Sequence, residues 1–251
     1  MTAPRLLLRG RSGFVALMKL YLTQWRRSRA PLALLALGVA FCYWDAALIR
    51  DGGGPWWTIT VMLIAWSGFL LGYDTYERLR FDGSLRLMLT HAEARLTFAM
   101  AFVTIASLLA AIVVLLSLGY LVIAGRIPSV WDALPILPIF LLAIGGWVAY
   151  AQVMSLLLPR DTAAVLGLLA IFFGSGAYDR WLPQGTPAFL RQVVRVIWES
   201  IPTSVRLSEV AAHRDLLRNS GIVTLQLAFA VGVIWVLLHR RNLLSRSEID
   251  A

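Results

Sequence analysis

The sequence is poor in the residues that build disulfides, metal sites and nucleotide-binding loops. It has a single cysteine, Cys42, and three histidines among 251 residues. One cysteine forms no intramolecular disulfide, and His91, His213 and His239 fall in separate regions without a ligand-spaced partner, so we expect no metal site. No glycine-rich loop runs into Gly-Lys-Ser/Thr, which excludes ATP binding through a P-loop.

Charge is also scarce. Charged residues make up 15% of the chain and hydrophobic residues 59%, and the mean hydropathy is +0.73. A soluble domain is closer to half apolar and a quarter charged, so the composition predicts an all-α polytopic membrane protein. The net charge of +9 would indicate nucleic acid in a soluble chain. Beside membrane spans, basic residues indicate orientation and contact with anionic lipid, so we expect no nucleic-acid partner.

Six apolar stretches are long enough to be membrane spans. They cover about residues 31–49, 56–73, 96–124, 133–158, 162–178 and 220–238. Residues 1–30 form a lead-in, and residues 31–251 form the predicted transmembrane domain. The second span carries Gly68 and Gly72 in a small-xxx-small pattern, for which packing within the chain is the favoured explanation. Arg240 and Arg241 are expected to stop the last span.

The lead-in contains an amphipathic pattern. Phe14, Met18, Tyr21 and Trp25 recur at spacings of three and four residues, which puts them on one face of a helix. Basic residues fall on the other faces, as in a helix that lies at a membrane interface. The alternative is the start of a long first span. Three arginines follow Trp25 within four residues and disfavour it, since each would cost ~2.5–3.5 kcal/mol at mid-membrane.

Residues 76–95 separate the second and third spans and are too charged to cross a bilayer. Four arginines alternate there with an apolar series, which predicts a short amphipathic helix lying at the membrane face or docked on another protein. A solvated loop is the alternative. The positive-inside rule puts this stretch, both termini and the 159–161 turn in the cytoplasm.

A pair of amphipathic helices is predicted in residues 187–218, between the last two spans. Apolar residues recur there at helical spacing, Pro202 breaks the series, and Ser204 is a candidate cap for a second helix that carries Leu216 and Leu217. A plain solvated loop would not need such a stripe. The predicted orientation makes this pair external, although it lies in a segment with six arginines.

Short motifs inside these segments match one family in order. Glu77-Arg78, Gly83-Ser84-Leu85, Leu87-Met88-Leu89 and Arg95 stand in the first cytoplasmic loop, and Pro187-x-x-Leu190 opens the external pair. The arrangement resembles the membrane subunit of an ATP-binding-cassette exporter of the ABC-2 type. In that family the loop is a coupling helix that docks on the ATPase. His91 stands where the family usually has a proline, which would alter the angle of the helix.

The resemblance implies a transport subunit rather than an enzyme, in the bacterial inner membrane. It makes the interfacial helix an elbow helix, and implies two copies of an ATPase subunit that bind ATP and Mg²⁺, no cofactor in this chain, and pairing with a second copy or a similar permease. The ATPase-coupling residues would be Glu77, Arg78, Gly83, Ser84, Leu85, Leu89 and Arg95. Aromatic residues of the first, second and fifth spans would line a route for a hydrophobic or amphipathic substrate: Tyr43, Trp44, Trp66, Phe172 and Phe173.

Two other functions stay open from the sequence. A lipid-modifying membrane enzyme would need a convergent polar set at one membrane face, and the sequence offers no such group of His, Asp and Ser. A non-transporting subunit that passes ATPase motion to an external partner would use residues 179–219 as its contact, and the arginines there favour it slightly.

Overall fold

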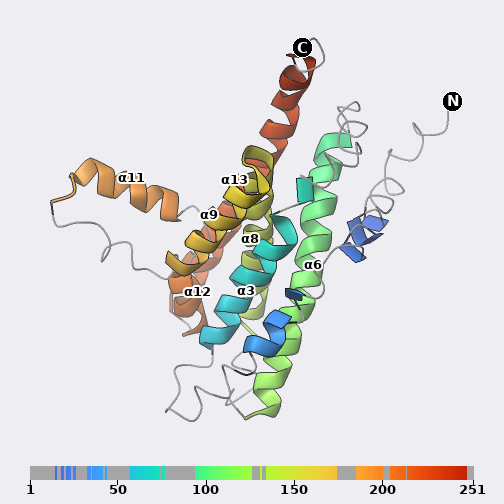
Figure 1. Cartoon of the computed structure of the whole chain (residues 1–251). Coiled ribbons are helices and arrows are strands. Elements are labelled where there is room, and N and C mark those ends of the chain that lie inside the picture. Colours follow the sequence, from blue (N-terminus) through green and yellow to red (C-terminus); the bar gives the residue numbers. More distant parts are fainter. Residues whose placement is uncertain are drawn as a thin grey trace.

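The computed structural model describes residues 57–73, 75–76, 94–125, 131, 134–173, 185–199, 204–212 and 214–247, with several positions in 15–26 and 33–43 (Figure 1). This part of the chain is helical apart from short turns and contains no strand. Its helices are α3 (Trp57–Gly72), α6 (Ala94–Ile123), α8 (Leu137–Leu157), α9 (Arg160–Phe173), α11 (Ala188–Glu199), α12 (Ser204–Ala211) and α13 (Leu216–Ser247).

Three of these helices are long and apolar enough to cross a membrane. The crossing segments are Ala99–Ile123, Leu137–Leu157 and Leu216–His239. Thr60–Gly72 and Asp161–Ile171 are apolar but shorter; the 16 residues of α3 reach about 24 Å against a hydrocarbon core of about 30 Å. The expected helical fold is confirmed for the described residues, three of their helices have the length and composition of membrane spans, and the count of six spans stays a prediction.

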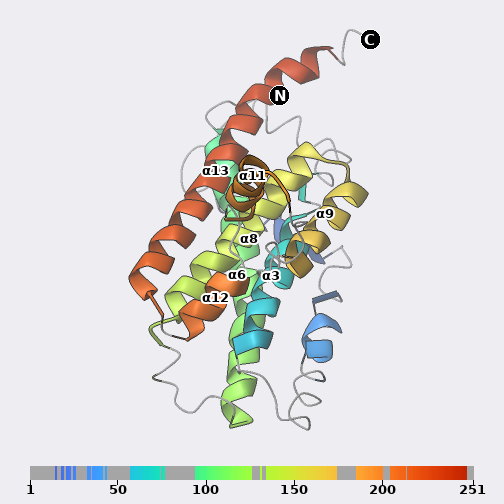
Figure 2. The ribbon, with the colours of Figure 1, turned by 90° about the vertical axis from the view of Figure 1, so that its left-hand side faces the viewer.

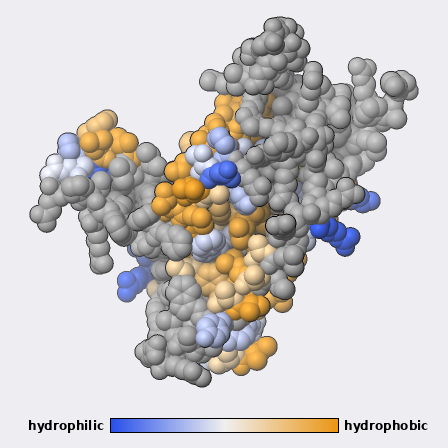
Figure 3. Space-filling model, in the orientation of Figure 1, coloured by the Kyte–Doolittle hydropathy of each residue, from blue (hydrophilic) through white to orange (hydrophobic). Residues whose placement is uncertain are grey.

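Exposed side chains agree with a lipid environment. On α6, Leu108, Ile112 and Leu116 recur every four residues, and all three are more than half exposed. Four-residue spacing puts them on one helix face. Hydrophobic residues also cover much of the described surface of the bundle in Figure 3. A surface of this kind is unfavourable in water and ordinary against lipid.

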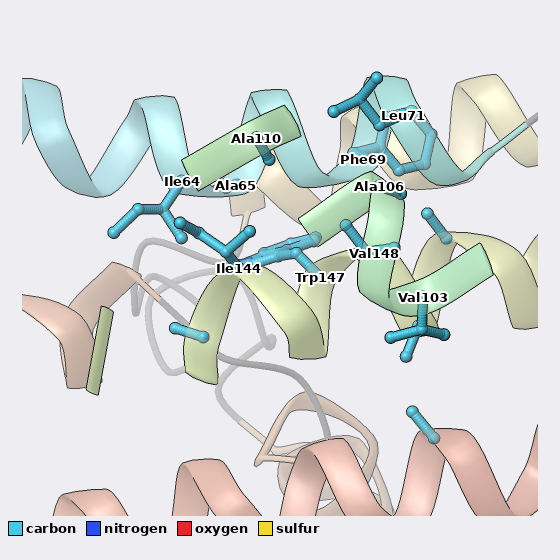
Figure 4. Packing of buried hydrophobic residues seen from close by; sticks show 14 of the residues in the cluster. Ile64, Ala65, Phe69, Leu71, Val103, Ala106, Ala110, Ile144, Trp147 and Val148 are labelled. Atoms are coloured by element: carbon cyan, nitrogen blue, oxygen red, sulfur yellow. The ribbon is translucent and has the colours of Figure 1, made fainter. Parts of the chain in front are cut away.

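Helix α8 is the centre of the bundle, because it packs against α3, α6, α9, α12 and α13. Its buried face alternates small residues with large ones. Trp147 is 1% exposed and fills the space between α8 and its neighbours, beside Ile144 and Val148 (Figure 4). Side chains from α3 and α6, including Phe69 and Ala106, complete this core.

The Gly68-x-x-x-Gly72 pattern is where α3 meets α8. A Cβ on Gly68 would lie 2.8 Å from the Trp147 Cβ, and one on Gly72 would lie 2.7 Å from both the Ala151 Cβ and the Val148 carbonyl oxygen. Only glycine permits this approach, so the expectation of packing within the chain is confirmed. Contacts advance in step along both helices, which shows that α3 and α8 run in the same direction. The predicted topology, in which they are the second and fourth spans, requires the same direction.

The start and end of α13 differ from the prediction. Leu216 and Leu217 begin α13 rather than end the preceding helix, because Asp215 adopts a positive φ of 46° and breaks the chain between α12 and α13. At the other end the apolar segment stops at His239, but the helix continues to Ser247 (Figures 1 and 2). Arginine is costly in lipid yet favourable in a helix, so Arg240 and Arg241 end the span without ending the helix.

The two amphipathic helices predicted in 187–218 form as α11 and α12, but only α12 joins the bundle. Leu207 and Val210 of α12 are fully buried, and α12 packs against α3, α8 and α13. Helix α11 lies apart from the bundle in Figure 1, and its Phe189 is 75% exposed.

Candidate functional site

Hydrogen bonds from three segments of the chain meet at the C-terminal end of α3. The Tyr21 hydroxyl donates to the Leu71 carbonyl oxygen at 2.7 Å, and the Thr75 hydroxyl donates to the same oxygen at 3.1 Å. The backbone N–H of Tyr76 donates to the Ser155 hydroxyl oxygen at 3.1 Å. We call these five residues the polar junction.

The junction forms because α3 ends inside the molecule. The last carbonyls of a helix lack partners within the helix, and leaving them unbonded in an apolar environment is costly. Side chains of Tyr21 and Thr75 supply donors for the Leu71 carbonyl, and Ser155 of α8 takes the N–H of Tyr76. A small set of polar side chains thus bonds backbone groups where the chain leaves the bundle.

Tyr21 attaches the N-terminal helical residues to two helices. Its ring is 5% exposed and stands edge-on to the ring of Phe102 in α6, with centroids 5.1 Å apart and an interplanar angle of 84°. Met18 and Trp25 are half-buried and pack against the core. Part of the face predicted to meet lipid therefore packs on the bundle instead. Phe14 lies outside the described residues, and the role of an elbow helix stays a prediction.

The predicted coupling stretch is held at both of its ends. Tyr76, its first residue, is fully buried, and burial raises the pKa of its phenol, so the hydroxyl stays protonated at physiological pH. Arg95 belongs to the first turn of α6. The remaining predicted coupling residues lie outside the described residues: Glu77, Arg78, Gly83, Ser84, Leu85 and Leu89. Residues 77–93 thus connect two helices of the bundle.

The aromatic residues of the predicted substrate route do not share one environment. Tyr43 is 78% exposed, whereas Trp66 is half-buried and packs against the core. Phe172 and Phe173 form the end of α9, where only the backbone is described, and Trp44 lies outside the described residues. The route stays a prediction.

Sequence reasoning missed how Tyr21 and Ser155 are used. The structure pairs Ser155 with Tyr76, stacks Tyr150 edge-on against Trp147, and buries Gln152 completely. A serine eight residues after Trp147 and five after Tyr150 carries no sequence signal of its partner, which lies 79 positions away in the chain.

No known family and no curated protein matches this chain. Within the described residues, no group of three or more His, Cys, Asp or Glu is placed to hold a metal ion. Function is therefore inferred from the chain's own pattern and from the polar junction.

Proposed function

We propose that the chain is the transmembrane permease subunit of an ATP-binding-cassette transporter of the ABC-2 type, exporting a hydrophobic or amphipathic substrate. Two copies of a separate ATPase subunit bind ATP and Mg²⁺, and a second copy of this or a similar permease completes the transporter. The proposal assigns this chain no catalytic or cofactor-binding role and puts both termini in the cytoplasm of a bacterial cell.

The polar junction is the observation that carries the proposal. The predicted coupling stretch follows Tyr76, whose backbone is bonded to α8, and Tyr21 is bonded to the last turn of α3. A displacement of residues 77–93 would therefore act on α3, α8 and the N-terminal helical residues at one place. A transporter driven by a separate ATPase needs a physical connection between the ATPase-docking segment and the helix bundle, and the bundle must have two discrete arrangements.

The pair α11 and α12 supports the same reading. The resembled family has a helical pair between its last two spans, and this chain has two short helices between α9 and α13, one packed into the bundle and one outside it. The described interior of the bundle consists almost entirely of apolar side chains. An apolar lining favours a substrate with a large apolar part.

Co-purification tests the proposal. The chain is expressed together with a Walker A protein from an adjacent reading frame and extracted in mild detergent. The proposal predicts that the two proteins elute together and that vesicles containing both move substrate only when ATP and Mg²⁺ are present. Separate elution in mild detergent would contradict it.

A second function, transmission of ATPase motion to an external partner without transport, is favoured by α11. Phe189 and Leu190 are 75% and 49% exposed on a helix that stands away from the bundle, which suits contact with another protein. Vesicles separate the two functions. The second function predicts ATP hydrolysis that depends on the chain, no substrate movement, and loss of partner activity when Phe189 is changed to Asp.

A further inference from the structure

Gln152 is a buried polar side chain five residues before the last residue of α8. It is 0% exposed, and among the described residues neither its amide nitrogen nor its amide oxygen has a hydrogen-bond partner. Buried amides in native proteins are nearly always bonded, because removing one from water without a partner is costly. Leucine would fill nearly the same volume without that cost, so the amide at this position indicates a use beyond packing.

The end of α3 covers this part of α8. A Cβ on Gly72 would lie 2.7 Å from the Val148 carbonyl oxygen and 3.4 Å from the backbone nitrogen of Gln152. One turn further along, Ser155 accepts the hydrogen bond from the Tyr76 N–H. Residues three and four apart share a helix face, so Gln152 lies on the face that carries Val148 and Ser155. Separating the end of α3 from α8 would break the Tyr76–Ser155 bond and open the face with Gln152.

The chemistry of the position selects an uncharged ligand group. An amide offers two donors and one acceptor but no charge. Every side chain that the structure describes as buried is apolar or neutral and polar. A charged headgroup would lose its hydration there without gaining a counter-charge, whereas a hydroxyl or an amide would exchange hydrogen bonds with water for hydrogen bonds with Gln152.

We propose that Gln152 binds the neutral hydrogen-bonding head of an amphipathic molecule, and that the end of α3, held by the Tyr76–Ser155 bond, closes this site. The inference rests on the proposed function in one respect, the force that moves α3. In that function the ATPase supplies the force through residues 77–93, which directly follow Tyr76. Binding itself requires only that the two helix ends separate.

Photolabelling of the full chain in lipid nanodiscs, without an ATPase subunit, tests the site. The probe is a long-chain primary alcohol with a diazirine beside its head, and the control probe is the same molecule without the hydroxyl. Ser155→Ala removes the acceptor of the Tyr76 bond and should raise labelling of residues 148–155. In that variant the alcohol should label these residues at least about threefold more than the control probe. Adding Gln152→Leu should bring the ratio to one.

Thr60→Val is the matched control, because Thr60 is also fully buried with its hydroxyl unbonded among the described residues but lies near the start of α3. It should leave the labelling ratio at residues 148–155 unchanged. Equal labelling by the two probes in the Ser155→Ala variant would overturn the proposal.

Thermal unfolding provides a second measurement. Gln152→Leu should unfold at the same temperature as the wild-type chain or higher, because it removes an unbonded buried amide. A lower unfolding temperature would overturn the proposal, since it would mean that the amide stabilises the fold. No ATPase is present in either experiment, so a negative result in them would contradict the binding site without contradicting the transporter assignment. Failure of the two proteins to co-purify would contradict the transporter assignment without contradicting the binding site.

Discussion

Helices α8 and α13 are both apolar enough to cross a membrane, but they differ in how much of their length is covered by the rest of the chain. In the apolar 18-residue segment of each helix, 78% is buried within the molecule for α8 and 28% for α13. The small residues of the two helices are used differently. Gly145 of α8 faces Leu227 and Ser107, whereas a Cβ on Gly221 or Gly232 of α13 would meet nothing within 4 Å. Hydropathy therefore identifies both helices as membrane segments without telling which of them forms the centre.

Changing the buried tryptophan should have the largest effect on stability. Trp147→Ala removes a side chain that is 1% exposed and leaves a cavity among α3, α6 and α8, so we expect a loss of about 3–5 kcal/mol in the free energy of unfolding. Trp235→Ala on α13 removes a side chain that is 44% exposed and should cost clearly less. Unfolding in mixed detergent micelles measures both, and equal losses would mean that α8 is not the centre of the bundle.

Replacing a glycine with alanine should distinguish the close α3–α8 contact from the open surface of α13 more sharply. Gly72→Ala forces the new Cβ against the Val148 carbonyl oxygen, so α3 and α8 must move apart at a cost of about 1–3 kcal/mol. Gly232→Ala puts the same Cβ into open space and should be neutral or stabilising, because alanine favours a helix over glycine. The same unfolding assay compares them, and an equally tolerated pair would contradict the close contact.

Removing one hydroxyl group should weaken the polar junction. Tyr21→Phe keeps the ring contact with Phe102 but leaves the Leu71 carbonyl with one donor fewer, so we expect a loss of about 0.5–1.5 kcal/mol. Tyr43→Phe, at a residue that is 78% exposed, is the control and should change little. Hydrogen exchange at the end of α3 should rise in the first variant and not in the second. Unchanged exchange in both would argue against the Tyr21 bond.

The smallest effect is expected where α13 begins. Asp215 has a φ of 46°, a conformation that glycine adopts more easily, so Asp215→Gly should be neutral or stabilise the chain by up to about 1 kcal/mol. Its neighbour Arg214 is exposed and lacks the positive φ, so Arg214→Gly should destabilise slightly. Opposite signs in thermal unfolding support the break between α12 and α13; a loss in both variants contradicts it.

The sequence predicted the features that depend on local pattern. Spacing and hydropathy placed α3, α6, α8 and α9 within a few residues of their bounds, and Gly68 and Gly72 indicated a close helix contact. Two short helices were correctly predicted on either side of position 202, although the second of them ends earlier than expected.

Features that depend on distant partners were not predicted. The Tyr21–Leu71 bond joins residues 50 positions apart, and the Tyr76–Ser155 bond joins helices whose register is set by two glycines. Burial of Gln152 follows from that same packing. Hydropathy placed the end of the last span correctly near His239 but did not predict that the helix continues to Ser247, because it measures the cost of arginine in lipid and not its effect on helix stability.

The central claim is that residues 77–93 pass the motion of an ATPase to the bundle through the polar junction. Glu77→Lys reverses a charge in that stretch and leaves the described core untouched. In vesicles that contain the chain and its ATPase subunit, this variant should keep ATP hydrolysis and lose most substrate transport, roughly tenfold or more, while a chain with Glu248→Lys behaves as the wild type. Normal transport by a folded Glu77→Lys variant would contradict the account.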